Sequence, residues 1–566
     1  MQQDIKHLQR RYSSLDLEYG SWYSHHKELV EYMLPRVSRF FTTERGTGGQ
    51  KKNTKLAEST AAMALRVMVA GFMSGMTNPS RVWHRLRVAD PDLNKFHPVK
   101  EWLEESRRRV AEAMLRSNLY TTLPQTYTNL GLVGTDAFAI QPDHRTGFRC
   151  YSLPIGSYRL GTDHRGFVDT VYRKVEMSVS QLVGQFGRDK CSPGVQSMWD
   201  RGNYDVFRPV VHAVEPNFER NPKALSSGAS MQWLSCYYEE GEQKELRRKG
   251  FERMPVIASR WSVIGEDVYG DSPGMMALAD VKQLQLMQRR KLELIEKNLR
   301  PPLVAPSGMK RRKISLIPSD ITYADTPAGG QKVEPLFMPT LSLADLTQEI
   351  GITQERIRKV FFADLFLMFA ELERGGLTAT EVLERKAEKL LGLGPVYLRL
   401  NDELFDPLVE WVFWHMFDSG QLPPPPPELE GQEIAVEYIS ILSQAMRAVG
   451  LESLERSSAY LGTIAQASPT VLDNYNFDAM AREHSEMLGL SPHLMFSPEA
   501  VKYSRDKTAQ QVAMQQSMEM AGQGAQVAKT LSETQLGDNN ALAQLMQRMP
   551  PASAIQSNSP IQGVAV

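Results

Sequence analysis

Two amphipathic helical segments separated by a short proline-rich unit constrain this chain more than any other feature. Apolar residues recur every three or four positions across 273–299 and again across 342–368, which is the spacing of one helix face. The intervening residues 301–341 hold seven prolines, three glycines and short β-like runs. Pro301 ends the first helix because proline cannot continue one. The pattern predicts an antiparallel helix pair that carries a compact, β-containing unit at its far end.

A narrow pair of this kind buries little apolar surface by itself, so it needs neighbours to complete its core. Symmetric copies of the chain packed side by side would supply them. An ordinary helical hairpin within a monomer is the alternative that the pattern leaves open.

The rest of the chain predicts an α+β, helix-rich fold. Residues 4–34 and 55–77 have helical periodicity, whereas short β-branched and aromatic runs between about 135 and 265 predict antiparallel sheet, with a helix near 178–186. After the pentaproline 423–427 we expect three or four helical segments, fading near residue 535. Since 566 residues exceed what one core holds, two or more packed regions are expected.

Composition restricts the function. The chain has 65 basic and 66 acidic residues, so its net charge is −1, whereas a protein that grips phosphates usually has a basic surplus. Three scattered cysteines, Cys150, Cys191 and Cys236, fit neither a disulfide framework nor a zinc site. The start of the sequence has no signal-peptide pattern, and no apolar run is long enough for a bilayer. We expect a chain made in a cytoplasm, with no membrane contact.

Three motifs invite a catalytic or ligand-binding interpretation. Residues 270–274 match G-x-S-x-G, which would make Ser272 a hydrolase nucleophile; the alternative is that Ser272 or Asp271 caps the helix that begins at Pro273. Residues 46–52 resemble a phosphate-binding loop only loosely. The pair His25-His26 is interpreted as solvated. We expect no catalytic group, metal or cofactor, and serine hydrolysis through Ser272 is the alternative function.

Two segments are candidate contact sites. The strongest basic run could face DNA phosphates or an acidic partner, although such runs are also commonly only solvated; it comprises Lys310, Arg311, Arg312 and Lys313. Helical periodicity breaks at 371–378, which suits a mobile loop because glycines lower the cost of reshaping it. The candidate residues of this loop are Glu371, Glu373, Arg374, Gly375 and Gly376.

A series of motifs then gives a family resemblance. They are YMLPR (32–36), KLAEST (55–60), AGFMSGMTNPSRVWHRL (70–86), GLVGTDAF (131–138), MPVIASRW (254–261), VYGDSPGMMALADVKQL (268–284), LTATEVLERKAEKLLGLGPV (377–396) and the apolar helix before GQLPPPPPEL. In order and spacing, over about residues 1–500, the sequence resembles the head-to-tail connecting (portal) proteins of short-tailed bacteriophages.

The resemblance implies a ring, usually a dodecamer, at one capsid vertex of the virion, assembled in the host cytoplasm. Such rings contact the major capsid and scaffolding proteins, dock the terminase large subunit, pass double-stranded DNA through a channel, and later hold a tail adaptor protein. By position, the resemblance implies a wing at 1–272, stem helices at 273–299 and 342–368, a clip at 300–341, a channel loop at 369–378, wing return helices at 379–430, a helical crown at 431–535 and a flexible tail at 536–566.

The near-neutral charge agrees with such a channel, because each phosphate–cation contact would slow sliding DNA. A structural or scaffolding virion protein that forms no ring is the second alternative function.

Overall fold

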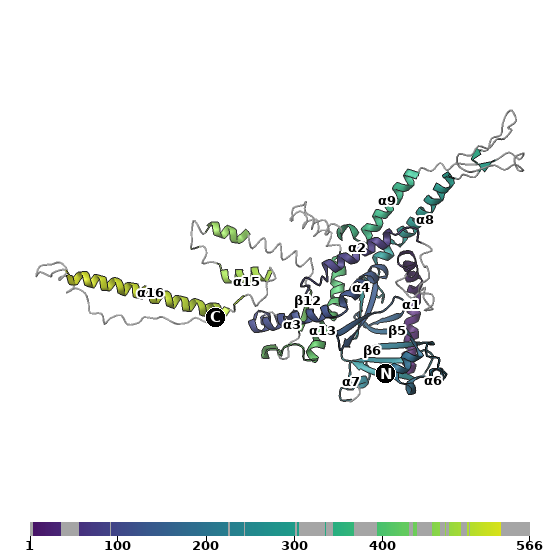
Figure 1. The fold of residues 1–566 in the computed structure, drawn as a ribbon, viewed down its shortest axis with the longest axis horizontal. Coiled ribbons are helices and arrows are strands. Elements are labelled where there is room, and N and C mark those ends of the chain that lie inside the picture. The colour runs from purple at the N-terminus through teal and green to yellow at the C-terminus, as the bar shows by residue number, and fades with distance from the viewer. Residues whose placement is uncertain are drawn as a thin grey trace, which may run out of the picture. The chain divides into compact units, whose positions relative to one another are not determined.

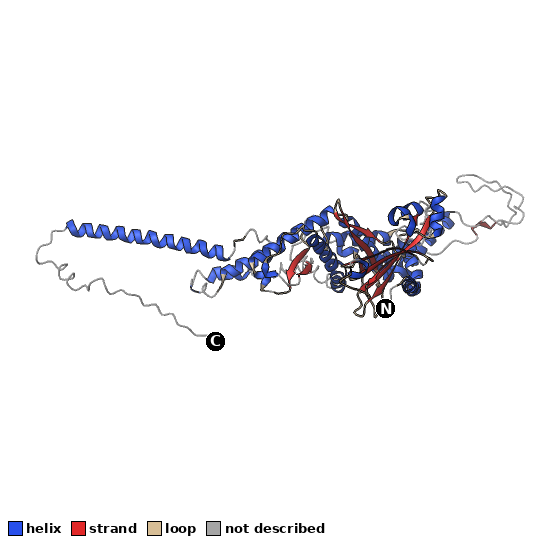
Figure 2. Cartoon of the chain, turned by 90° about the horizontal axis from the view of Figure 1, so that it is seen from below, coloured by secondary structure: helices blue, strands red, loops and turns tan. Residues whose placement is uncertain are grey.

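The computed structural model describes residues 4–35, 56–299 (except 91, 225–226 and 243), 303–304, 334–335, 343–366, 393–429, 434–438, 456–464, 470, 475–487, 495–496 and 498–533. It divides into two units, 1–492 and 493–566. The described part of the second unit is dominated by one long helix, α16 (Pro498–Glu533). Figure 2 shows the secondary structure of both units.

Two antiparallel sheets form the middle of the first unit (Figure 1). The smaller has the order β3 (Gly147–Ser152), β2 (Thr135–Asp143), β9 (Val256–Arg260). The larger has the order β4 (Tyr158–Thr162), β5 (Val168–Ser178), β6 (Phe207–Pro216), β7 (Trp233–Glu239), β8 (Glu245–Phe251). The antiparallel sheet predicted between 135 and 265 is therefore confirmed. The predicted helix within it is also present, as α5 (Val179–Phe186), and a capping box of Ser178 and Gln181 starts it.

Helices cover the five-stranded sheet on both faces. On one face, Leu8 and Leu15 of α1 (Ile5–Met33) pack with Tyr172, Val211 and Cys236. On the other, apolar residues of α5 and α6 (Pro193–Asp200) pack with alternate strand positions such as Val210 and Tyr237. Successive strand residues point to opposite faces, so neighbours such as Val210 and Val211 belong to different clusters.

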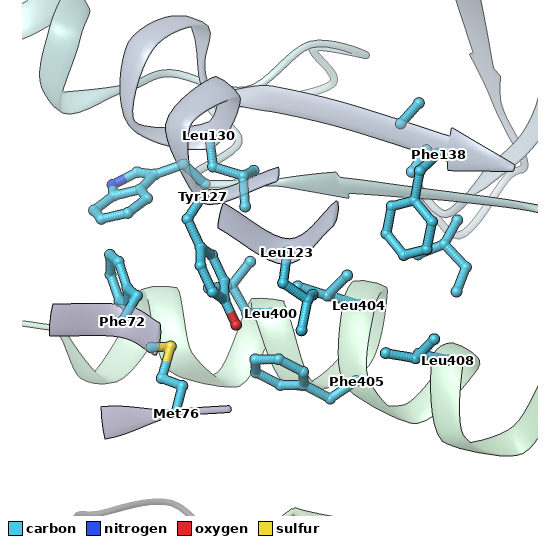
Figure 3. Close-up of a cluster of buried hydrophobic side chains, with 14 of the residues drawn as sticks. Phe72, Met76, Leu123, Tyr127, Leu130, Phe138, Leu400, Leu404, Phe405 and Leu408 are labelled. Atoms are coloured by element: carbon cyan, nitrogen blue, oxygen red, sulfur yellow. The ribbon is translucent and has the colours of Figure 1, made fainter. Parts of the chain in front are cut away.

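The main core lies between helices from distant parts of the chain (Figure 3). α2 (Thr60–Gly75) contributes Phe72, and α4 (Leu119–Val133) contributes Leu123 and Tyr127. Leu400 and Leu404 approach from α12 (Gly394–Leu400) and from the π-helical turn η5 (Asn401–Phe405). Residues near 400, which follow the helix pair, thereby return to the N-terminal body.

A buried ion pair fastens this return segment to the smaller sheet. Arg260 of β9 is 2% exposed and Glu403 of η5 is 7% exposed. An Arg260 Nη2–H donates to Glu403 Oε1 over 2.6 Å, while the Arg260 backbone N–H and Nε–H donate to Oε2 over 2.9 and 3.1 Å. Arg399 adds a fourth donor to Glu403 at 3.0 Å, and Arg260 also donates to the Gly166 carbonyl oxygen at 2.6 Å.

The remaining elements complete the two units. They are β1 (His84–Val88), η2 (Leu93–Lys95), α3 (His97–Arg116), η3 (Arg188–Lys190), α7 (Ser227–Ser230), α13 (Asp406–Asp418), η6 (Pro427–Leu429), β12 (Ile434–Tyr438) and α15 (Phe477–Met487). Within the described residues, no helix combines the length and hydropathy needed to cross a membrane.

The expected start of a helical crown at residue 431 is wrong. β12 pairs with β1 in antiparallel register, from His84 opposite Tyr438 to Val88 opposite Ile434. Residues 434–438 therefore belong to the N-terminal body, because a five-residue strand needs a partner for its backbone hydrogen bonds. The boundary between the two units instead follows Pro492.

The interpretation of His25-His26 as a solvated pair is also wrong. His26 is 2% exposed, and its Nδ1 lies 3.2 Å from the Tyr19 hydroxyl. Burial lowers the pKa of His26 to about 3, so the ring is neutral at physiological pH. His26 is a core residue of α1, with its ring against Tyr19, Trp22 and Tyr269.

Candidate functional site

The predicted helix pair is present and projects from the sheets (Figure 1). α8 (Pro273–Leu299) packs along α9 (Leu343–Val360), and the short strands β10 (Leu303–Val304) and β11 (Glu334–Pro335) pair antiparallel just beyond them. The chain therefore runs outward along α8 and returns along α9. Outside β10 and β11, the proline-rich unit 301–341 lies beyond the described residues, and with it Lys310, Arg311, Arg312 and Lys313.

The base of α8 is fixed by Ser272. Its hydroxyl accepts a hydrogen bond from the Met275 backbone N–H and donates one to the Leu132 carbonyl oxygen, both over 3.0 Å. The predicted helix cap is thus confirmed, whereas the nucleophile interpretation is wrong. A hydrolytic serine must be accessible and bonded to a general base, but Ser272 is 1% exposed and serves two backbone groups.

Glycines at the base of α8 allow the backbone of residues 270–274 to approach the backbone of residues 132–134 closely. A Cβ on Gly134, which has φ of 74°, would lie 2.2 Å from the Gly270 carbonyl oxygen. A Cβ on Gly274 would lie 2.4 Å from the Leu132 carbonyl oxygen. Two of the motifs that carry the family resemblance, GLVGTDAF and VYGDSPG, therefore meet here and set where α8 leaves the body.

Gln285 provides a second attachment nearly halfway along α8. Its side-chain oxygen accepts from the backbone N–H groups of Ala57 and Glu58 over 2.6 and 3.0 Å, and its amide donates to the Glu58 carbonyl oxygen over 2.8 Å. Gln354 of α9 donates to the Glu58 carboxylate over 3.3 Å. The KLAEST motif is thus the clamp that holds both helices to the body.

Beyond this clamp the helix pair has too few partners. All of α8 is described, and past Gln285 its only buried residue is Leu294. Leu286, Leu292 and Leu299 are 55%, 63% and 78% exposed. Leu292 and Leu299 are seven residues apart and so lie on one helix face. Burying each of these leucines against a neighbouring surface would contribute on the order of 1–2 kcal/mol to the free energy of that contact, since complete burial of leucine is worth about 1.5–3 kcal/mol.

The two helices carry eight basic and six acidic residues, and some of these charges are paired within the helix pair. Arg290 pairs with Glu293 over 2.6 Å on α8, and Lys359 pairs with Glu355 over 2.9 Å on α9. Arg356 lies 3.6 Å from Asp280 and links the two helices. Such compensated charges give phosphates little net attraction.

The second helix ends earlier than the sequence predicts. We expected it to reach Met368, but α9 ends at Val360 and Phe362 has φ of 55°, which is costly for a residue other than glycine. The turn buries both Phe361 and Leu365. It also brings the Phe366 ring to 5.4 Å from the ring of Phe72. The candidate loop 369–378, with Glu371, Glu373, Arg374, Gly375 and Gly376, lies outside the described residues, as does 46–52.

Among the described residues, no group of three histidine, cysteine or carboxylate side chains could hold a metal ion. The candidate site is a projecting helix pair with a fixed base and exposed leucines on its outer half.

Comparison with known proteins agrees with the motifs and with this architecture. A portal protein of Salmonella phage epsilon15 is 41% identical over 538 residues, which cover 94% of this chain and 96% of that protein. A probable portal protein of Bordetella phage BPP-1 is 39% identical over 543 residues, covering 96% and 98%. Among solved structures, a chain from the virion of a native gene transfer agent particle aligns with 73% of this chain at a TM-score of 0.32 and 11% identity, a similarity too weak to support an argument. The family model for bacteriophage head to tail connecting proteins matches residues 5–495, and the chain belongs to that family.

Proposed function

We propose that this chain is the portal subunit of a bacteriophage, and that twelve copies of it, the number that the family resemblance implies, form a closed ring through which double-stranded DNA enters and leaves the head. The observation that carries the proposal is the projecting helix pair, whose outer half leaves Leu286, Leu292 and Leu299 without cover. Neighbouring copies in a ring present the same face repeatedly and would bury these leucines. The role is structural, and the ring belongs in the virion at the junction of head and tail.

The compensated charges of α8 and α9 suit a passage for DNA. Because each cation that neutralises a phosphate adds affinity, a wall whose basic residues are nearly balanced by acidic ones would let the duplex slide. The loop 369–378 is then proposed to touch DNA, since its mixed charges and two glycines allow contact without tight binding.

The unit 300–341 is proposed as the docking surface for the terminase large subunit during packaging and for the tail adaptor afterwards. It follows α8 and precedes α9, so it lies at the exposed end of the pair. Its run Lys310–Lys313 would supply cations for acidic partner surfaces or for DNA. Contacts with the major capsid and scaffolding proteins fall to the rest of the ring, during assembly in the host cytoplasm.

The test is whether the outer face of α8 drives assembly. The double variant Leu292→Glu, Leu299→Glu should shift purified protein from rings to single chains of about 64 kDa, because it places carboxylates in the proposed contact. Electron images and light scattering would measure this. The matched control is Leu115→Glu on α3, where the leucine is 53% exposed but lies in the body. Rings that form normally with both glutamates would contradict the proposal, and wild-type protein that never forms an annulus would favour a non-ring virion protein.

A further inference from the structure

A pocket of about 640 Å³ lies on the five-stranded sheet, away from the helix pair. Its floor consists of alternate residues of three strands, and α5 forms one wall with Gln181, Gly184 and Gln185. The floor residues are Arg173, Val175 and Met177 of β5, Val210 and His212 of β6, and Tyr237 of β7. Since a pocket of this volume is typical of ligand sites, its chemistry decides what it could hold.

Arg173 is held in place by neutral partners. Its Nε–H donates to His212 Nδ1 over 3.0 Å, and an Nη2–H donates to the Tyr237 hydroxyl over 3.1 Å. The His212 ring stacks on Tyr237 with centroids 3.9 Å apart, and its Nε2 lies 2.9 Å from Ser235 Oγ. Because His212 accepts at Nδ1, its ring is neutral, and burial beside Arg173 and Arg247 holds the pKa of His212 well below its usual value. Three of the five N–H groups of Arg173 remain for a ligand.

The pocket has an uncompensated positive charge. Arg173 has no carboxylate within 4.0 Å among the described residues, nor does Arg247, which lies 4.7 Å over the Tyr237 ring. Three other cations of the same region are paired with carboxylates, namely Lys174 with Glu240, Arg188 with Asp200 and Arg248 with Glu245. The one acid of the lining, Glu176, is exposed and lies on the alternate face of β5 from Arg173. Two half-enclosed guanidinium groups without a counter-charge favour an anionic ligand.

We propose that this pocket binds a carboxylate side chain of an extended acidic segment from a partner protein. The free N–H groups of Arg173 suit the two oxygens of a carboxylate, the side-chain amide of Gln185 suits a peptide backbone, and Val175 and Met177 suit a neighbouring apolar side chain. A pocket recessed between α5 and the sheet admits a peptide but not a duplex, whose phosphates lie on a convex surface. The site would give the ring a second place of partner capture, separate from the clip.

The test uses assembled full-length protein and two probes that carry fluorescein at the N-terminus, Leu-Glu-Leu-Glu-Leu-amide and the same peptide with Gln for Glu. Fluorescence anisotropy should show saturable binding of the Glu peptide and at least about tenfold weaker binding of the Gln peptide, because a charge-assisted bidentate contact is lost. Arg173→Gln should weaken binding of the Glu peptide by about tenfold or more. Arg173→Lys should have an intermediate effect, because lysine keeps the charge but lacks the two parallel N–H donors of the guanidinium. The matched control Arg188→Gln breaks an exposed pair in the same region and should leave binding within about twofold.

Several outcomes would overturn this assignment. The first is no saturable binding of the Glu peptide to wild-type rings, and the second is equal binding of the two peptides. A third is wild-type affinity in both Arg173 variants, each checked for a wild-type melting transition. Displacement of the peptide by a double-stranded oligonucleotide, dependent on Arg173, would make the occupant DNA. Binding to single chains but not to rings would make the occupant a neighbouring copy of this chain.

Discussion

Replacing Glu403 with leucine should lower the melting temperature of the body of the protein. Glu403 accepts three hydrogen bonds from Arg260 and one from Arg399, and Arg260 and Glu403 are both almost fully buried. Without the carboxylate, the guanidinium of Arg260 keeps only the Gly166 carbonyl oxygen as a partner. Removing one member of a buried pair costs about 3–5 kcal/mol, because the remaining charge stays out of water.

The assay is thermal unfolding followed by circular dichroism at one protein concentration, since assembly also stabilises the folded state. At about 2.1 cal/mol/K of unfolding entropy per residue, a body of roughly 490 residues loses about 1 °C per kcal/mol, so Glu403→Leu should lower the melting temperature by about 3–5 °C. The double variant Arg260→Met, Glu403→Leu should recover most of the loss, because no unpaired charge remains. As a control, Arg290→Gln breaks a pair between two exposed side chains and should cost about 1 kcal/mol or less. A Glu403→Leu melting temperature equal to wild type, or a double variant less stable than Glu403→Leu alone, would refute the reasoning.

Four further predictions follow from the structure and the proposals. Gly274→Ala should lower the melting temperature and ring yield, because its Cβ would lie 2.4 Å from a backbone carbonyl oxygen of α4; an unchanged melting curve would contradict this. Deleting 371–376 should permit rings and capsids but reduce retained DNA, and wild-type yields of filled particles would leave the loop a simple connection. Arg311→Glu with Arg312→Glu should spare ring formation while impairing packaging or tail attachment; loss of rings would instead make the segment an assembly element. Burial beside Asp402 and Glu410 raises the pKa of Asp406 to about 7 from 3.8, so the free energy of unfolding should fall as the pH rises from about 4 to 7. Asp406→Asn should therefore raise the melting temperature at pH 8 but not at pH 4. An equal shift at both pH values would contradict this prediction.

Features with a local signal could be predicted from the sequence. The helix pair and the antiparallel sheet follow from periodicities of 3.6 and 2 residues, and the cap at Ser272 follows from a serine placed before a proline. The end of α9 could not be predicted in this way. The apolar period continues past Val360, but burial of Phe361 and Leu365 against the body favours a turn at 361–362, after which residues 363–366 are helical again.

Contacts between distant positions carried no such signal. No local sequence pattern distinguishes Arg260 and Glu403 from charged residues at the surface, and only the fold shows that they form one buried ion pair. Gln285 gave a faint sign, as a polar residue on the apolar stripe of Leu278, Val281 and Leu284, and its clamp on KLAEST was still missed. The basic run 310–313 and the loop 369–378 stay predictions, since both lie outside the described residues.

The pairing of β1 with β12 has a consequence for synthesis of the chain on the ribosome. β1 leaves the ribosome early, but its partner follows only after the sheets, the helix pair and the return helices have been made. At roughly 5–20 residues per second, the intervening stretch of about 350 residues takes on the order of 20–70 s. Until then the edge of β1 lacks its native partner, so a nascent body cannot be complete before its own α8 and α9 exist. Incomplete chains would thus be kept out of growing oligomers by the order of translation itself.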